Sequence, residues 1–327
     1  MKNPYLKVIM KFRKLLPAIG IVILIYILIT IDVETIILNF SGIKPIYLIL
    51  SFLSLIPILI ITNYEWQLIL KKQKINVSYI YSLKNILIGY FYGFITPGGL
   101  GAYTRTFYLQ NESEAPIQKC LSNIIILNTV DYISLLLLGI IGGILVGSRF
   151  PHLFVLLIIM FTTSLTLFLL FLRRETLTNF LNRILQHKIF TLLRNKFDSS
   201  INSFFIDMPK PRDLLIPFTV SILGWILRFS ELYLISKLFS IEVPYIYFIM
   251  IIAIANVVAS LPVTIYGLGT REMTMISLFS IFSVSPERIV SLSLFWFVII
   301  WLFPSVLGAV IAVKEGGFTN KSKPKMM

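Results

Sequence analysis

The sequence contains few of the residues that build catalytic and metal sites. Among its 327 residues there is one cysteine, Cys120, and there are two histidines, His152 and His187. A single cysteine excludes an intrachain disulfide and a cysteine-based metal site, and the histidines lie in or near expected loops without forming a metal-ligand pair. No Walker motif and no DxxD-like cluster occurs either, so we expect no metal, no cofactor and no enzyme activity.

Charged residues are also scarce. They make up 13% of the sequence, whereas 57% of the residues are hydrophobic and the mean hydropathy is +0.88. No long polar block is present that would form a soluble domain. A membrane-spanning helix needs about 20 mostly apolar residues, and runs of this kind occur from one end of the sequence to the other. The composition therefore predicts an all-α polytopic membrane protein, with residues 1–327 in a single membrane domain.

About eight apolar segments are present, and six of them are long enough to cross a membrane completely. The six runs are Leu15–Ile31, Pro45–Thr62, Leu121–Val146, Leu153–Leu172, Leu214–Leu238 and Ile289–Val313. We expect the first run to be retained as a helix, because it is long for a signal peptide and no small-residue cleavage site follows it. Two further segments, Tyr79–Ile95 and Tyr245–Leu261, each run into a glycine motif.

The excess of basic over acidic residues predicts how these segments are oriented. Lys and Arg number 29 against 15 Asp and Glu. In a soluble protein this excess would suggest nucleic-acid binding, but here the cations cluster between apolar runs, where they favour the cytoplasmic side. We therefore expect no nucleic-acid partner and a multi-pass protein of the cell membrane with cytoplasmic N- and C-termini. The basic loop 173–213 is expected inside, with an amphipathic helix on the inner leaflet, and the segment Glu65–Ile75 is expected to behave similarly.

Two segments combine helix breakers with an arginine: TPGGLGAYTR (Thr96–Arg105) and SLPVTIYGLGTRE (Ser260–Glu272). Such features are costly at bilayer depth, because unpaired backbone groups and charges have no water there. If the first segment dips in and returns, every basic cluster falls on the cytoplasmic side. Three full crossings separate it from the second segment, so a second hairpin would enter from the opposite side. Charge bias alone leaves open whether both arms of the second hairpin cross fully.

The two motifs also correspond to each other in sequence. The corresponding features are GLG at 99–101 and 267–269, the arginines Arg105 and Arg271, and the prolines Pro116 and Pro286, with spacings of 168, 166 and 170 residues. A long apolar run follows each proline. This pattern predicts an inverted repeat, with one copy over about 45–147 and the other over about 214–313, of the kind that transporters use to build a midplane site from two oppositely oriented re-entrant hairpins.

The sequence resembles the flippase-like membrane family typified by the membrane part of lysylphosphatidylglycerol synthase. SLPVTIYGLGTRE resembles the family's Pro…Gly-Leu-Gly-x-Arg-Glu signature, and the first motif resembles its Pro–Gly-Gly…Arg element. Asp131 falls where the family often has an Asp-Arg pair, but Tyr132 follows it here, and no acidic residue follows the first glycine pair at Leu100–Ala102. The resemblance implies lipid translocation or a related lipid-handling role. It does not imply aminoacyl transfer.

The motifs predict a site for a lipid headgroup. Glycines let the backbone adopt positive φ, a restarted helix presents N–H groups to an anion, and arginine can bind phosphate with two parallel hydrogen bonds. The predicted binding residues are Pro97, Gly98, Gly99, Arg105, Asp131, Pro262, Gly267, Gly269, Arg271 and Glu272. The alternative is that the glycines only allow tight packing and that Arg271 is merely paired with Glu272.

Four other polar residues form a predicted secondary path: Arg228, Glu231, Asn128 and Asn256. Arg228 and Glu231 are three residues apart on one helix, so a structural ion pair is the expected role for them. Asn128 and Asp131 also share a helix face, and interhelical hydrogen bonding and substrate contact are equally compatible with that spacing.

These features predict a translocator for a phospholipid or polyprenyl-phosphate-linked lipid with a phosphate-containing headgroup. A non-transporting accessory protein and an integral membrane enzyme of lipid or lipid-linked glycan metabolism are the alternatives. The expected partners are membrane lipids, with a homo-oligomer or a lipid-processing enzyme as further possibilities.

Overall fold

The computed structural model describes residues 33–147, 149–173, 202–261 and 267–315, and these residues form helices and no strands. Among the described residues, five helical stretches are long and apolar enough to cross a membrane: Pro45–Lys72, Ile117–Val146, Pro151–Phe171, Pro211–Phe239 and Pro286–Lys314. They coincide with five of the six predicted spans. The first predicted span, Leu15–Ile31, lies outside the described residues, as does most of the basic loop 173–213 with its predicted amphipathic helix.

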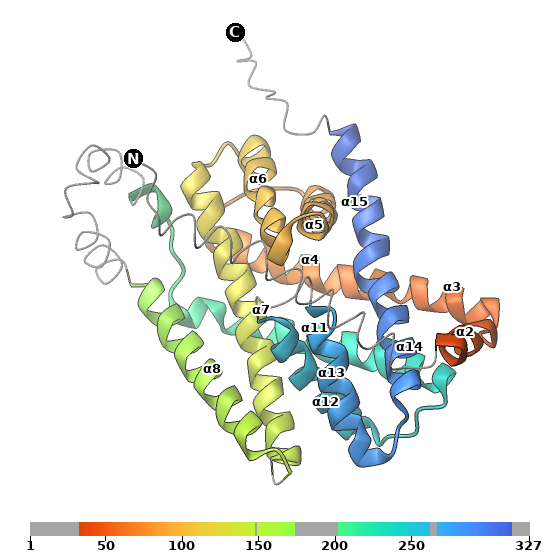
Figure 1. The fold of residues 1–327 in the computed structure, drawn as a ribbon. Coiled ribbons are helices and arrows are strands. Elements are labelled where there is room, and N and C mark those ends of the chain that lie inside the picture. Colours follow the sequence, from red (N-terminus) through yellow and green to blue (C-terminus); the bar gives the residue numbers. More distant parts are fainter. Residues whose placement is uncertain (1–32, 148, 174–201, 262–266, 316–327) are drawn as a thin grey trace, which may run out of the picture.

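Figure 1 shows the arrangement of the helices in the described part of the chain. The α-helices are α2 (Val33–Ser41), α3 (Pro45–Leu53), α4 (Leu55–Lys72), α5 (Tyr79–Phe94), α6 (Arg105–Ser113), α7 (Ile117–Val146), α8 (Pro151–Phe171), α11 (Leu215–Ser236), α12 (Tyr245–Ala259), α13 (Thr270–Phe279), α14 (Pro286–Phe297) and α15 (Phe303–Lys314). The 3-10 helix η1 (Pro97–Thr104) joins α5 to α6, and a π-helical turn, η7 (Val298–Leu302), joins α14 to α15.

Prolines explain two interruptions in the long stretches. Pro57 cannot donate a hydrogen bond to the carbonyl of Leu53, and the helix is interrupted between α3 and α4 at Ser54. Pro304 at the start of α15 likewise lacks an N–H group, and the wider π turn η7 precedes it. Trp301 lies in this π turn and lines a cavity inside the bundle.

Two pairs of short helices fold back on themselves. In the first, the Tyr81 hydroxyl donates to the Tyr108 carbonyl at 2.8 Å, so the start of α5 lies beside the middle of α6. In the second, the rings of Tyr247 and Phe282 lie 5.4 Å apart, so the start of α12 lies beside the segment that follows α13. Figure 1 shows the α5–α6 hairpin and the α12–α13 hairpin toward opposite ends of the bundle.

A long helical stretch follows each hairpin: α7 follows the first, and α14–α15 follows the second. Each of these stretches packs closely against the first helix of the other hairpin, which is α12 for α7 and α5 for α15. A methyl group at Gly142 of α7 would lie 2.7 Å from the carbonyl oxygen of Met250 in α12. A methyl group at Gly308 of α15 would overlap the carbonyl oxygen of Leu87 in α5. These two glycines are 166 residues apart, the same spacing as Arg105 and Arg271. The contacts α7–α12 and α15–α5 therefore correspond to each other in the two halves.

Ion pairs gather several basic segments at one end of the molecule. Lys72 lies 3.2 Å from Asp213, and Lys74 and Lys119 lie 2.7 and 2.8 Å from the two carboxylate oxygens of Asp207. These contacts join the turn after α4, the start of α7 and the segment before α11. The prediction that Glu65–Ile75 lies on the membrane surface is wrong, because Glu65 belongs to α4 and is only 3% exposed, and apolar contacts from neighbouring helices cover this part of α4.

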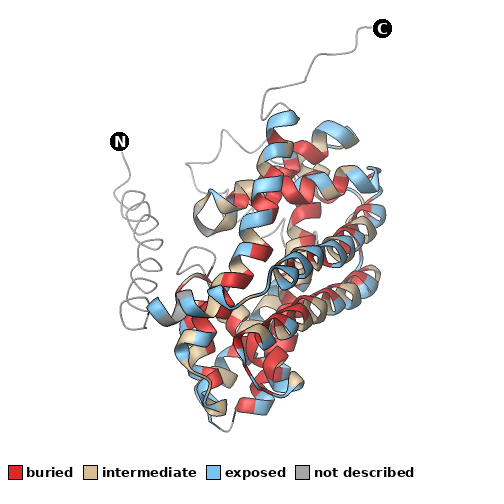
Figure 2. Cartoon of the chain, turned by 90° about the vertical axis from the view of Figure 1, so that its right-hand side faces the viewer, coloured by how far each residue is buried: buried red, intermediate tan, exposed pale blue. Residues whose placement is uncertain are grey.

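The outer surface of the helix bundle is apolar. Of the most apolar 18-residue window in each helix, 56% is buried in α7 but only 11% in α8, so α7 lies inside the bundle and α8 at its periphery. Figure 2 shows buried residues on the inward faces of the helices and exposed residues on the outward faces. Large exposed side chains on these outward faces include Leu167, Leu215, Leu234 and Val310. An apolar outer surface of this kind is typical of helices that face lipid.

Candidate functional site

A cavity of about 280 Å³, lined by four charged side chains and several apolar ones, lies inside the bundle at the break in the first hairpin. The lining residues come from α4, α5, η1, α6, α7, α11 and η7, and they are Thr62, Glu65, Ile86, Gly89, Tyr90, Gly99, Ala102, Arg105, Leu127, Asn128, Asp131, Arg228 and Trp301. Three of the predicted binding residues, Gly99, Arg105 and Asp131, are therefore brought together, and Asn128 and Arg228 from the predicted secondary path join them.

Arg105 is held in the cavity by neutral oxygens and by an aromatic ring. Its Nε donates to the carbonyl of Ala102 at 3.1 Å, and one Nη donates to Oδ1 of Asn128 at 3.1 Å. The guanidinium carbon lies 5.5 Å from the ring centroid of Trp66. The absence of a side chain at Gly89 makes room for Arg105, since a methyl group there would lie 2.5 Å from Cδ of the arginine. The planar guanidinium is thus oriented before any ligand binds.

Arg228 lines the same cavity from α11. It donates to the Thr62 hydroxyl at 2.7 Å, lies 3.7 Å from the carboxylate of Asp131, and stacks over Trp225 at 4.8 Å. The prediction that Arg228 pairs with Glu231 is wrong, because the described ion pair of Arg228 is with Asp131. Glu231 instead accepts a hydrogen bond from Ser54, which lies between α3 and α4, and it is not among the residues that line the cavity. Packing of α11 against α7 and α4 selected a different partner from the one suggested by helical spacing.

Two carboxylates balance these two arginines. Asp131 accepts a hydrogen bond from Ser221 at 3.3 Å in addition to its contact with Arg228. Glu65 is 3% exposed, and its Oε1 is buried with no hydrogen-bond partner in the described structure. With both carboxylates ionised, the cavity-lining side chains carry no net formal charge.

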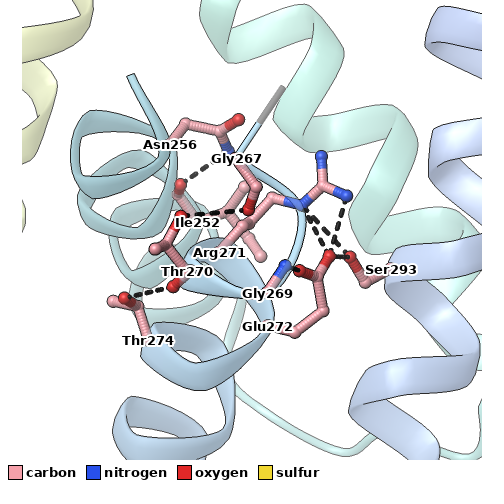
Figure 3. Close-up of polar contacts among 9 residues, drawn as sticks. All are labelled: Ile252, Asn256, Gly267, Gly269, Thr270, Arg271, Glu272, Thr274 and Ser293. Carbon is pink, nitrogen blue, oxygen red and sulfur yellow. Dashed lines mark hydrogen bonds and ion pairs between the residues drawn. The ribbon is translucent and has the colours of Figure 1, made fainter. Parts of the chain in front are cut away.

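The second hairpin break has a different arrangement (Figure 3). Arg271 is 1% exposed, and its guanidinium donates to the carboxylate of Glu272 at 3.1 and 2.8 Å and to Ser293 at 3.1 Å. The other oxygen of Glu272 accepts from the backbone N–H of Gly269, which precedes α13. Trp296 lies 5.5 Å from the guanidinium. Neither Arg271 nor Glu272 is among the described residues that line the cavity.

The remaining predicted residues serve the backbone or lie elsewhere. Gly99, Gly267 and Gly269 have φ values of +70°, +72° and +89°, in the region that favours glycine. Pro97 and Gly98 begin η1. Asn256 bonds to the carbonyl of Ile252 in its own helix at 2.8 Å (Figure 3). Pro262 lies outside the described residues.

Sequence reasoning missed eight of the lining residues, and four of these have polar side-chain groups: Thr62, Glu65, Tyr90 and Trp301. Glu65 had a usable signal, because an acidic residue that follows a long apolar run without a break in helical pattern is a candidate for a buried functional charge. The other three are common in apolar helices, and only the packing of α4, α5 and η7 brings them to one place.

The fold and the cavity define a multi-pass membrane protein with a charge-lined interior site enclosed by apolar helices. Comparison with known proteins then gives the family: the chain belongs to the family described as the lysylphosphatidylglycerol synthase TM region, whose model matches residues 17–308. This match confirms the resemblance found in the motifs. The chain is also similar to the UPF0104 membrane protein MJ1595 of Methanocaldococcus jannaschii, with 25% identity over 301 residues, covering 86% of this chain and 88% of the relative.

Proposed function

We propose that the protein moves a lipid with a phosphate-containing headgroup between the leaflets of a membrane, and that the headgroup binds in the cavity at the first hairpin break. The observation that carries this proposal is the pair of arginines, Arg105 and Arg228, that two unconnected helices direct into one cavity. A guanidinium presents parallel N–H groups that match the oxygens of a phosphate. The family name, which refers to a phospholipid synthase, supports a lipid as the ligand.

The contrast between the two breaks supports placing the headgroup at the first one. At the second break, the carboxylate of Glu272 already occupies the N-terminal end of α13 and pairs with Arg271. In the sequence, Thr106 follows Arg105 where Glu272 follows Arg271. The first break therefore has no carboxylate at the matching position, and a phosphate from a ligand can supply the anion there.

In this proposal the two hairpins are re-entrant and enter the membrane from opposite faces. The end that carries Lys72, Lys74 and Lys119 faces the cytoplasm, as do both termini, because basic residues favour that side. The headgroup then moves through a polar interior while the acyl or isoprenoid tails remain in lipid. The protein acts as a transporter and not as an enzyme, with anionic membrane lipids as its partners.

The test is leaflet exchange in liposomes that contain the purified full-length chain. Fluorescent phosphatidylglycerol and a fluorescent polyprenyl phosphate are the probes, and dithionite quenching reports the fraction in each leaflet. We expect the wild-type protein to accelerate exchange of at least one probe. The Arg105→Ala variant should exchange lipid about 30-fold more slowly than the wild type. The reason is that removing the arginine from its buried pair with the headgroup phosphate costs about 2 kcal/mol or more.

The matched control is Arg288→Ala, which removes an exposed arginine at the other end of the bundle whose side chain bonds only the Ser240 carbonyl among the described contacts. This variant should exchange lipid at the wild-type rate. If wild-type protein leaves the exchange of both probes unchanged, the translocator proposal is wrong, and a non-transporting accessory role or an enzyme acting on such lipids becomes the better explanation.

A further inference from the structure

The carboxylates that line the cavity, the buried Glu65 and the partly exposed Asp131, have no role in simple phosphate binding. An anion site needs cations and N–H donors, yet Glu65 and Asp131 line the same cavity as Arg105 and Arg228. We call Glu65 and Asp131 the carboxyl pair. They come from α4 and α7, which pack against each other, and each interacts electrostatically with Arg228.

Binding of a phosphate disturbs the charge balance of the cavity. With both carboxylates ionised, the two arginines and the two carboxylates sum to zero, so a headgroup phosphate with one negative charge leaves one negative charge uncompensated. The phosphate also competes with Asp131 for Arg228, which lies 3.7 Å from that carboxylate. An uncompensated charge inside a protein is strongly unfavourable, and Oε1 of Glu65 is already buried without a hydrogen-bond partner in the part of the chain that the structure describes.

We propose that the carboxyl pair takes up one proton for each negative charge of the headgroup phosphate that enters the cavity. This inference rests on the proposed function and adds a coupling ion to it. A proton from water on the binding side bonds to a carboxylate oxygen of the pair as the phosphate replaces Asp131 at Arg228. On release, the proton returns to water on the other side and Asp131 pairs with Arg228 again. The cycle therefore carries headgroup and proton together and moves no net charge.

The ionisable groups around the carboxyl pair are consistent with this exchange. Those that line the cavity are Arg105 at the start of α6, Tyr90 of α5 and Arg228 of α11, in addition to the pair itself. Three other helices pack against α4 or α7, namely α3, α8 and α12, and they contribute no lining residue to the cavity. The two arginines are the cations among these groups, so a proton is the only positive charge that the pair can gain without another ion.

The first test measures proton uptake by the full-length protein in weakly buffered detergent at pH 7. The probe is dihexanoylphosphatidylglycerol, which carries one negative charge, and a pH indicator reports the protons taken up. We expect about one proton per bound lipid. The variants Glu65→Gln and Asp131→Asn, made singly and together, should reduce that number, and the double variant should bring it near zero while lipid still binds.

The control is Glu287→Gln, which makes the same chemical change at a carboxylate at the start of α14 that lies outside the cavity. Its proton uptake should equal that of the wild type. Wild-type binding without proton uptake overturns the inference and leaves the proposed function intact. No binding of any phosphate lipid by the wild type overturns the proposed function itself. These two failures are therefore distinguishable without reference to any variant.

The second test applies gradients to liposomes that contain the protein. A difference of one pH unit should drive fluorescent phosphatidylglycerol toward an asymmetry of about tenfold between leaflets, because one coupled proton contributes a factor of ten in the equilibrium ratio. A potassium diffusion potential without a pH difference should leave the distribution unchanged. Asymmetry that follows the potential and ignores the pH difference contradicts the inference.

Discussion

The two hairpin breaks share GLG, a positive-φ glycine and a following arginine, yet they use the arginine differently. Arg105 lies in a cavity and donates to the neutral oxygens of Ala102 and Asn128. Arg271 is 1% exposed and is bound by Glu272 and Ser293. In both cases the polar partner on the long helix lies 22 or 23 residues after the arginine, in α7 or in α14.

The difference teaches that one residue decides the role of such a motif. Where an acid follows the arginine, it caps the restarted helix and neutralises the guanidinium, so the break becomes a structural tie. Where threonine follows, no carboxylate occupies the matching position, and the proposed function assigns that position to the phosphate of a ligand. The second break, which matches the family signature more closely, is therefore the one whose arginine already has a carboxylate partner from the same chain.

The largest effect in this comparison is expected from Glu272→Ala. It leaves Arg271 buried without its carboxylate and removes the acceptor for the N–H of Gly269, which should cost about 3–5 kcal/mol of unfolding free energy. Denaturant titration in detergent measures the loss. Glu287→Ala, at the start of α14, is the control and should change stability by less than about 0.5 kcal/mol. Equal stabilities of the two variants would show that Arg271 does not depend on Glu272.

Gly267→Ala should have the next largest effect. Its φ of +72° disfavours any side chain, and a methyl group would also overlap Ala259 of α12. We expect a loss of about 2–3 kcal/mol, since strained backbone costs about 1–3 kcal/mol before the overlap is added. The equivalent change Gly99→Ala, at φ +70°, should cost about 1 kcal/mol. Thermal unfolding measures the stability of both variants. A larger loss for Gly99→Ala than for Gly267→Ala would contradict the close approach of Gly267 to Ala259.

Thr106→Glu tests whether an acidic residue directly after the arginine blocks ligand binding at the first break. The new carboxylate would follow Arg105 as Glu272 follows Arg271, and it would compete with the headgroup for the guanidinium. We expect binding of dihexanoylphosphatidylglycerol to weaken about 30-fold, equivalent to about 2 kcal/mol. Thr106→Gln has the same size without the charge and should bind lipid far better than Thr106→Glu. Equal weakening in both variants would mean that size, and not charge, blocks the site.

The smallest effect is expected away from both breaks, at Asp207. Hydrogen bonds from Lys119 and Lys74 lower the pKa of Asp207 below its ordinary value of 3.8. A lowered pKa in the folded state stabilises the fold above the unfolded value, and this contribution is lost as pH falls through the folded pKa. Asp207→Asn should therefore cost at most about 1 kcal/mol at pH 7, a difference from wild type that shrinks below pH 3.8. A difference that stays constant with pH would exclude the ion pairs as its cause.

Much of the fold follows from the sequence, because spanning helices need long apolar runs and the runs are visible. The glycine motifs and their spacing also predicted where the chain breaks. The cavity followed only in part. Arg105, Asn128 and Asp131 were predicted, but the pairing of Arg228 with Asp131 joins residues 97 positions apart, and local helical spacing favoured Glu231 instead. Glu65 was missed because the lysines after it suggested a surface segment, whereas apolar side chains from neighbouring helices enclose it.

The most direct test of the account is a structure of the full-length protein with dihexanoylphosphatidylglycerol bound. The account predicts density for the phosphate between Arg105 and Arg228, with Arg271 still paired to Glu272. Phosphate density at Arg271, with its pair to Glu272 broken, would contradict it.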